Sequence, residues 1–258
     1  MTNSSHLPEY VHRLAATEDF TFSCHTGLDC FTDCCRMLEL ALTPYDVLRL
    51  RRATSLTSQE ILDRYVICEH ESEEPFPRFY LAMVDDGRAG CVFVSKTGCR
   101  IYPHRPSACR AYPLGRAAIR TERDNITEHF VILKEKHCLG FHETKDQTPS
   151  QYCEEQGLDT YNTFNDAVAQ ILQHDAIRQG FMPSKKQVGL FTMALYNLDT
   201  FRTKLVNNEI KTAPSPTGYT IATMGDEELL YFAISWLKEK LFSSPQKPSP
   251  ATNRNLPG

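Results

Sequence analysis

The feature that most constrains this chain is its cysteine content. Four cysteines fall within twelve residues in the stretch FSCHTGLDCFTDCC, and the last two are adjacent. Four more cysteines follow in a region rich in turn-forming residues, where tight turns allow distant side chains to converge on one centre. The predicted ligand set is Cys24, Cys30, Cys34, Cys35, Cys91, Cys99, Cys109 and Cys138.

The rest of the composition indicates why these thiols need a role. The N-terminal sequence MTNSSHLPEYVHRLAATEDF has no basic segment followed by an apolar one, so we expect no signal peptide. No apolar run reaches about 18 residues, so we expect neither a transmembrane helix nor a membrane partner. The expected location is the cytoplasm, where thiols are kept reduced and structural disulfides are rare. Metal or cluster ligation is the usual alternative for so many cysteines.

Charge and motifs exclude several other functions. The formal net charge of −4 gives no general reason to expect nucleic acid as a partner. The sequence contains no GxSxG, HExxH or P-loop motif, so it offers none of the common signatures of nucleophilic, zinc-protease or nucleotide chemistry. Whether the protein is an enzyme is left open by these patterns.

The number of thiols predicts metal binding more strongly than their spacing predicts the metal. Eight thiols match two four-sulfur sites, or one four-sulfur cluster with additional structural or redox thiols. Four-cysteine ligation suits both Zn²⁺ and an iron–sulfur cluster such as [4Fe-4S], with a slight preference here for iron. Consecutive side chains on a strand point to opposite faces, so Cys34 and Cys35 could serve one centre or two. Four histidines near the cysteines are further candidate ligands: His25, His70, His104 and His137. Two cysteines outside the set, Cys68 and Cys153, are expected to be ordinary buried residues.

Basic residues are interleaved with the later cysteines. Between positions 95 and 121 there are six basic residues and no acidic one, in and around CRIYPHRPSACRAYPLGR. Guanidinium groups can offset the negative charge of a thiolate site and donate hydrogen bonds to sulfur, so we expect Arg100, Arg105 and Arg110 to support a bound metal or cofactor. A solvated basic face and an anion site remain alternatives. Pro106 is expected to begin a helix whose dipole would favour a thiolate at Cys109.

The segment GCRIYPHRPSACRAYPLG, with the earlier CC pair and the later HCLG, resembles the CxxCxxCC or YkgJ-type family of cysteine-cluster proteins. That family is described as a zinc- or iron-chelating domain, and residues 22–140 carry the resemblance. It implies that the eight thiols are the metal ligands and that Arg105 and Pro106 match the family's RP step. The first cluster is spaced more widely here than in the family's name. The later YNLDTFR and DEELLYFAISWLK resemble the helical extension of longer bacterial members.

Three functional hypotheses follow. The first is a cytosolic metal-binding protein whose clustered cysteines coordinate an iron–sulfur cluster or zinc. The second, by analogy with flagellin lysine methylases that carry a similar cluster, is an S-adenosylmethionine-dependent protein lysine methylase-like enzyme. The chain has neither the CxxxCxxC triplet of radical enzymes nor a GxGxG loop for that cofactor. The third is a redox or metal-delivery protein in which Cys34 and Cys35 exchange with a protein partner.

The expected fold class is α+β. We expect an irregular cysteine-rich metal-binding core with short strands in residues 22–140, and a helical C-terminal region in residues 148–242 that either packs with it as one domain or stands apart. Residues 243–258 are polar and proline-rich, so we expect them to be disordered. The first 21 residues are expected to form a short lead-in with at most one helical turn.

Local signals place the individual elements. Capping sequences that begin at Thr43 and Thr57 stand ahead of VLRLRR and ILDRYV and predict that these segments are helical. Thr148 predicts a short helix that ends near Gly157. Apolar periodicity predicts further helices over residues 163–179, 184–206 and 226–242. Strands are predicted over residues 79–84 and 91–94, joined by a turn at residues 85–87, and over residues 128–134.

Overall fold

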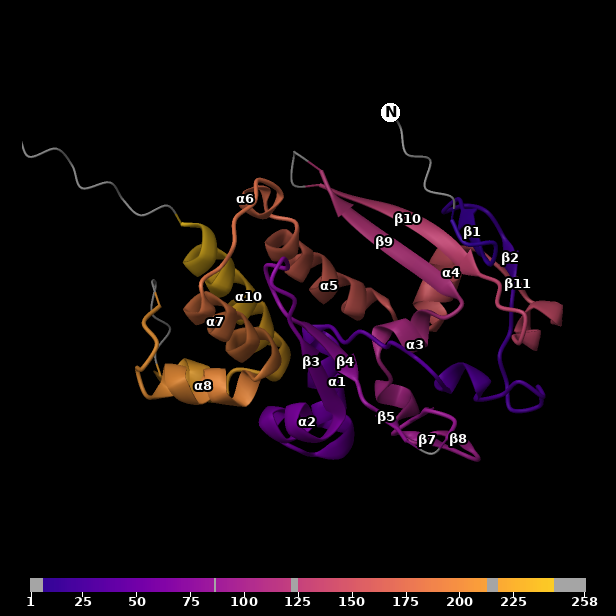
Figure 1. Cartoon of the computed structure of the whole chain (residues 1–258), viewed down its shortest axis with the longest axis horizontal. Helices are drawn as coiled ribbons and strands as arrows, with labels where there is room; N and C mark the ends of the chain where they lie inside the picture. Colours follow the sequence, from indigo (N-terminus) through magenta and orange to yellow (C-terminus); the bar gives the residue numbers. More distant parts are fainter. Residues whose placement is uncertain (1–6, 86, 122–124, 213–217, 244–258) are drawn as a thin grey trace, which may run out of the picture.

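The computed structural model describes residues 7–85, 87–121, 125–212 and 218–243. The fold is α+β, as predicted, with helices and short antiparallel strands (Figure 1). The predicted disordered tail from residue 244 onward lies outside the described residues, as does Asp86 of the predicted turn. Among the described residues, no helix combines the length and the apolar character needed to cross a membrane.

The first two helices begin where the capping sequences predict. Helix α1 (Pro44–Thr54) starts with a capping box, in which the Thr43 hydroxyl accepts from the Asp46 N–H and the Asp46 carboxylate accepts from the Thr43 N–H at 2.8 Å. Helix α2 (Ser58–Tyr65) repeats the arrangement with Thr57 and Glu60. These bonds satisfy N–H groups that have no partner within the helix, which is why the signal can be read from sequence.

The C-terminal half is helical, but two predicted helices are each divided. The predicted helix over 163–179 is interrupted at His174, whose side chain accepts from the Ala176 N–H. The predicted helix over 184–206 is interrupted at Asn197, which caps the next helix in the same way. The helices of this half are α4 (Pro149–Glu155), α5 (Asp159–Leu172), α6 (Asp175–Arg178), α7 (Lys185–Tyr196), α8 (Leu198–Val206), α9 (Gly218–Thr223) and α10 (Asp226–Phe242).

The strands are short, and most pair with the next strand in the sequence, whereas β1 (Val11–Leu14) and β2 (Phe20–Thr21) pair with strands more than a hundred residues away. A three-stranded antiparallel sheet has the order β1 (Val11–Leu14), β10 (Ile126–Leu133), β9 (Leu114–Arg120). The residues expected to be a lead-in therefore supply β1 and also β2. The predicted strand over 79–84 is divided into β4, which pairs with β3, and β5, which pairs with β6. The two-stranded pairs are β2 (Phe20–Thr21) with β11 (Asp146–Gln147), β3 (Val66–Glu69) with β4 (Arg78–Leu81), β5 (Met83–Val84) with β6 (Gly90–Cys91), and β7 (Val94–Ser95) with β8 (Gly98–Cys99).

Three short 3-10 turns and one short helix position most of the cysteine-rich segments. The turns are η1 (Asp33–Cys35), η2 (Tyr102–His104) and η3 (Leu139–His142), and the helix is α3 (Ser107–Ala111). In Figure 1, α3 lies near the centre of the molecule, with the helices α7, α8 and α10 to its left and strands β9 and β10 of the sheet above it.

One hydrophobic core joins the two halves of the chain. Its buried members include Leu50 from α1 and Leu237 from α10. Ion pairs reinforce this contact, because Arg51 of α1 reaches Asp199 of α8 at 3.0 Å and Asp226 of α10 at 2.6 Å. We propose on these grounds that residues 22–140 and 148–242 fold together as one domain.

The Asp199 ion pair predicts a pH dependence of stability. Burial alone would raise the pKa of Asp199, but hydrogen bonds from Ser58 and the charge of Arg51 outweigh it and hold the pKa below its ordinary value of 3.8. The stabilisation is therefore complete above about pH 5 and is lost as the pH falls through the lowered pKa of the folded state. We expect Asp199→Asn to lose about 1 kcal/mol at pH 6 and less at pH 3, measured by urea unfolding.

The matched control is Asp63→Asn on the exposed side of α2. Asp63 accepts a hydrogen bond from Gln59 and has no ion-pair partner among the described residues. Its replacement should leave the difference in unfolding free energy between pH 6 and pH 3 as in the unmodified protein. Equal pH dependence in the Asp199→Asn and unmodified proteins would contradict the assignment.

Candidate metal centre

The eight predicted ligands gather into two groups. All ten cysteines of the chain carry free thiols. We call Cys24, Cys30, Cys34 and Cys138 the first thiol group, and Cys91, Cys99 and Cys109 the second thiol group. Cys35 belongs to neither group as defined here, because its backbone connects the two.

The first thiol group surrounds a small cavity of about 20 Å³. All four of its cysteines line this cavity, together with Phe22, Leu28, Tyr112, His137 and Gly140. Burial and the neighbouring thiols Cys34, Cys138 and Cys30 raise the pKa of Cys24 to about 11. The Leu139 N–H donates to the sulfur of Cys30 at 3.2 Å. These four side chains therefore share one space although their positions span more than a hundred residues.

Close backbone contact brings the two ends of this group together. The Ser23 N–H donates to the Gly140 carbonyl at 3.0 Å, which ties the segment before Cys24 to the turn after Cys138. A Cβ at position 140 would lie 2.5 Å from a ring carbon of Phe22 and 2.8 Å from the Ser23 carbonyl oxygen. Only glycine permits this approach, so Gly140 is part of what assembles the group.

The second thiol group is carried by three different short elements. Cys91 ends β6, Cys99 ends β8, and Cys109 lies on α3. Burial raises the pKa of all three thiols, and neighbouring cysteines of the same group raise those of Cys91 and Cys109 further. The Phe93 N–H donates to the sulfur of Cys91 at 3.5 Å.

The expected helix-dipole effect on Cys109 is not what governs this thiol. Helix α3 has only five residues, so its dipole is small, and Pro106 caps it rather than forming its first turn. Burial dominates instead and raises the pKa of Cys109, with the nearby Cys91 and Asp46 adding to the rise. The neutral thiol is therefore favoured when no cation is present.

Cys34 and Cys35 connect the two groups. Cys34 lines the first cavity, and a hydrogen bond with Cys35, followed by burial, raises its pKa. An antiparallel bridge pairs Arg36 with Gly90, and the Met37 N–H donates to the Ala89 carbonyl at 2.9 Å. Cys35 ends the turn η1 directly before this bridge, so its backbone lies close to β6, which ends at Cys91. Cys34 thus belongs to the first thiol group, while the backbone of Cys35 runs beside the second.

The side chains of the two groups have the chemistry of thiolate ligands, although they do not converge on a single point in this structure. Within the described residues, no three His, Cys, Asp or Glu side chains have the arrangement of a metal site. The thiols instead contact one another and Tyr112, whose pKa is raised by burial and by the neighbouring Cys138 and Glu135. Four sulfur donors line one cavity, with Cys24 exposed and the other three half-buried, and sulfur donors are the ligands that zinc and iron–sulfur centres take.

The arginines predicted to support the site differ in their surroundings. Arg105 is only 8% exposed and donates to the Tyr102 carbonyl at 2.9 Å. Burial raises the pKa of Cys24 and Cys99, and the positive charge of Arg105 partly opposes that rise in both. One buried guanidinium therefore acts on thiols of both groups.

The other two arginines are fixed mainly by backbone carbonyls. Arg100 donates to the Val92 carbonyl at 2.5 Å, and its charge partly opposes the rise in the pKa of Cys91 and Cys99 that burial causes. Arg110 donates to the carbonyls of Pro103 and Gln156 and lies over the ring of Tyr161.

The remaining candidate residues are mostly engaged elsewhere. Cys153 is buried, as expected, but Cys68 is exposed on β3, because the side chains of this edge face solvent. His137 lines the cavity of the first thiol group, whereas His25 pairs with Glu143 at 3.4 Å and His70 contacts the Glu74 carbonyl at 3.0 Å.

Sequence reasoning missed one residue that positions the second thiol group. The Asp46 carboxylate is fully buried and accepts from the Ser107 N–H at 2.7 Å and from the Ser107 hydroxyl at 3.0 Å. It therefore joins the start of α1 to the helix that carries Cys109. The capping box identified Asp46 as a local cap, but nothing in the sequence signals its partner 61 residues away.

Comparison with known proteins gives a match over the cysteine-rich part of the chain. The model of the CxxCxxCC family, described as "Putative zinc- or iron-chelating domain", matches residues 23–154, which are 132 of the 258 residues. The match includes all members of both thiol groups and Cys35. No curated protein and no solved structure matches the chain.

Proposed function

This chain belongs to the CxxCxxCC family of zinc- or iron-chelating domains, and we propose that it binds metal at two centres. The first thiol group would supply one centre. The second thiol group, completed by Cys35, would supply the other. The observation that carries this proposal is the cavity lined by four cysteines, with the other thiols gathered separately and Cys35 directly before the bridge that joins Arg36 to β6.

The proposed metal is iron, held as an iron–sulfur cluster such as [4Fe-4S]. The backbone N–H groups that donate to the sulfurs of Cys30 and Cys91, and the charge of buried Arg105, are the kind of surroundings that stabilise a negatively charged cluster. Zinc is the second candidate, favoured by the first cavity, whose volume of about 20 Å³ is nearer to that of a single ion than of a cluster.

Anaerobic purification followed by metal and acid-labile sulfide analysis separates these candidates. Iron with equimolar sulfide and broad visible absorbance supports the cluster. Zinc without visible absorbance would overturn the iron assignment and leave the two-centre proposal standing.

We also propose that the protein acts in the cytoplasm, which suits free thiols because that compartment keeps them reduced.

The two-centre proposal predicts that replacing a ligand of one centre removes about half of the metal bound per chain. Cys138→Ser should remove the first centre and Cys91→Ser the second, so each variant should retain about half of the metal bound per chain, because serine oxygen is a poor ligand for metals that prefer thiolate. The double variant should retain almost none. Elemental analysis of the purified proteins measures this directly.

The control for both variants is Cys68→Ser, because Cys68 lies on β3 outside both thiol groups. It should retain the full metal content. Complete loss of metal in each single variant would contradict two centres and indicate one shared cluster.

A further inference from the structure

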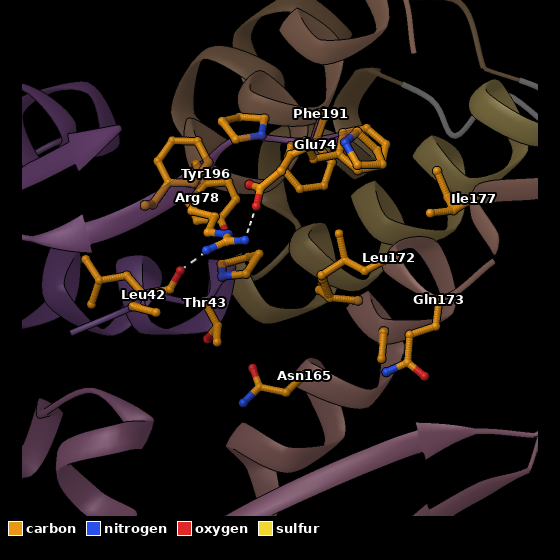
Figure 2. Close-up of a pocket in the computed structure, with 18 residues that line it drawn as sticks. Leu42, Thr43, Glu74, Arg78, Asn165, Leu172, Gln173, Ile177, Phe191 and Tyr196 are labelled. Atoms are coloured by element: carbon orange, nitrogen blue, oxygen red, sulfur yellow. Dashed lines mark hydrogen bonds and ion pairs between the residues drawn. The ribbon is translucent and has the colours of Figure 1, made fainter. Parts of the chain in front are cut away.

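We propose that a second site, separate from the cysteines, binds a neutral and mainly apolar small molecule that carries one hydrogen-bond donor. The site is a cavity of about 460 Å³ lined by the residues that lead into α1, by residues 74–79, and by side chains from helices α5, α6 and α7 (Figure 2). Its volume lies within the range of about 300–1,000 Å³ that is usual for small-molecule sites. No cysteine lines it, so its ligand would not be the metal.

The walls of this cavity are apolar and well ordered by packing. On one side, the rings of Phe76 and Phe191 stack with their centroids 4.2 Å apart, and Phe191 also contacts Tyr196. On the other side lie Leu172 and Ile177 (Figure 2). Leu172 is 44% exposed, a large apolar side chain left in contact with water beside the cavity. Burying these surfaces against an apolar ligand is favourable.

Most polar groups of the lining already have partners within the protein. The Thr43 hydroxyl belongs to the α1 capping box, and the Tyr196 hydroxyl donates to the Leu42 carbonyl at 3.3 Å. The Gln173 side chain accepts from the Arg120 N–H and donates to the Ala118 carbonyl. These groups are therefore not available to a ligand.

Asn165 on α5 is the exception among the described lining residues. Its side-chain oxygen is buried and has no hydrogen-bond partner. Leaving such a group unpaired costs about 1–3 kcal/mol. Figure 2 shows its side chain extending from α5 into the space below Thr43 and beside Gln173. Asn165 as a whole is only half-buried, so a rotation of its side chain would bring this oxygen to an N–H or O–H group on a ligand, and that requirement defines the polar part of the ligand.

The charges of the lining indicate that the ligand is neutral. The charged side chains there are Glu74 and Arg78, and these pair with each other. A charged ligand would have to leave water without an opposite charge free to receive it, which is costly in an apolar cavity. A neutral molecule with an aromatic or aliphatic body meets no such penalty.

The test uses the full-length, metal-loaded protein and the fluorescent probe N-phenyl-1-naphthylamine, a neutral apolar molecule with one N–H group. We expect saturable binding of one probe per chain, seen as increased fluorescence. Leu172→Asp places a charge beside the cavity and should weaken binding at least tenfold. Its matched control is Val206→Asp, because both residues are exposed and each ends a helix. The control should keep the affinity of the unmodified protein.

A second pair of measurements tests Asn165 itself. In 1-benzylnaphthalene a methylene group replaces the N–H of the probe, and the molecule can be measured as a competitor. We expect the unmodified protein to prefer the N–H probe about tenfold, which corresponds to one hydrogen bond, and Asn165→Leu to lose that preference. Absence of saturable binding, or equal binding in the unmodified and Leu172→Asp proteins, would overturn the proposal. Metal content should be unchanged in every variant, so the result is independent of the metal centres.

Discussion

Replacing Cys109 by serine should both remove metal from the second centre and lower the melting temperature by about 10 °C. Cys109 lies on α3 beside Cys91, Cys99 and buried Asp46, in a region built from two-residue strands with little regular structure of its own. In such a frame the free energy of ligation is also free energy of folding, because the unfolded chain has no formed site. Metal analysis and thermal melting of the same preparation measure the two effects together.

The control for this prediction is Cys153→Ser, which makes the same chemical change at a buried cysteine outside both thiol groups. This variant should keep its full metal content, and its melting temperature should fall only by the amount that the altered packing of one buried side chain causes. We expect Cys34→Ser, Cys35→Ser and Cys99→Ser to behave as Cys109→Ser does. Unchanged metal content together with unchanged melting in Cys109→Ser would contradict its role as a ligand.

The parts of the fold that could be predicted are those fixed by local hydrogen bonds. The starts of α1, α2 and α4 were predicted from Thr43, Thr57 and Thr148, because a capping box involves residues only three positions apart. Helix α10 was predicted over its full length because a continuous apolar face marks it. The breaks at His174 and Asn197 were missed, because apolar periodicity continues across them while a side chain competes with the helix backbone.

The parts that could not be predicted depend on contacts between distant residues. Strand β1 pairs with β10 through partners such as Val11 and Leu133, and four residues give too short a pattern to reveal that pairing. The same limit applies to β2 and β11, which pair with each other and whose two-residue length leaves no alternation to read.

The candidate site, like the fold, could be predicted only in part from the sequence. The density of cysteines was enough to predict the set of eight thiols. The basic residues between them pointed to Arg105, which is buried near thiols of both groups. How the thiols divide between two groups was left open, since it depends on the contact between Ser23 and Gly140 and on the pairing of Arg36 with Gly90. Neither contact has a signature in the sequence around the cysteines.

Asp46→Ala should destabilise the protein by about 3–4 kcal/mol and also weaken metal binding at the second centre. Asp46 is fully buried, and its carboxylate accepts four hydrogen bonds, from the N–H and hydroxyl groups of Thr43 and of Ser107. Alanine leaves these partly buried donors without their partner and releases the start of α3, so Cys109 is no longer held beside its neighbours. Urea unfolding and elemental analysis measure the two consequences.

The corresponding residue of the next helix provides a matched control that separates a local cap from a tertiary link. Glu60 occupies the same position in the α2 capping box as Asp46 does in α1, but among the described residues its carboxylate bonds only to Thr57 and to Arg64 on its own helix. Glu60→Ala should therefore cause a much smaller loss of stability and leave the metal content unchanged. If the two variants lost equal stability, Asp46 would be no more than a helix cap. A larger loss in Asp46→Ala, accompanied by loss of metal, would identify Asp46 as the residue through which the helical core positions the second thiol group.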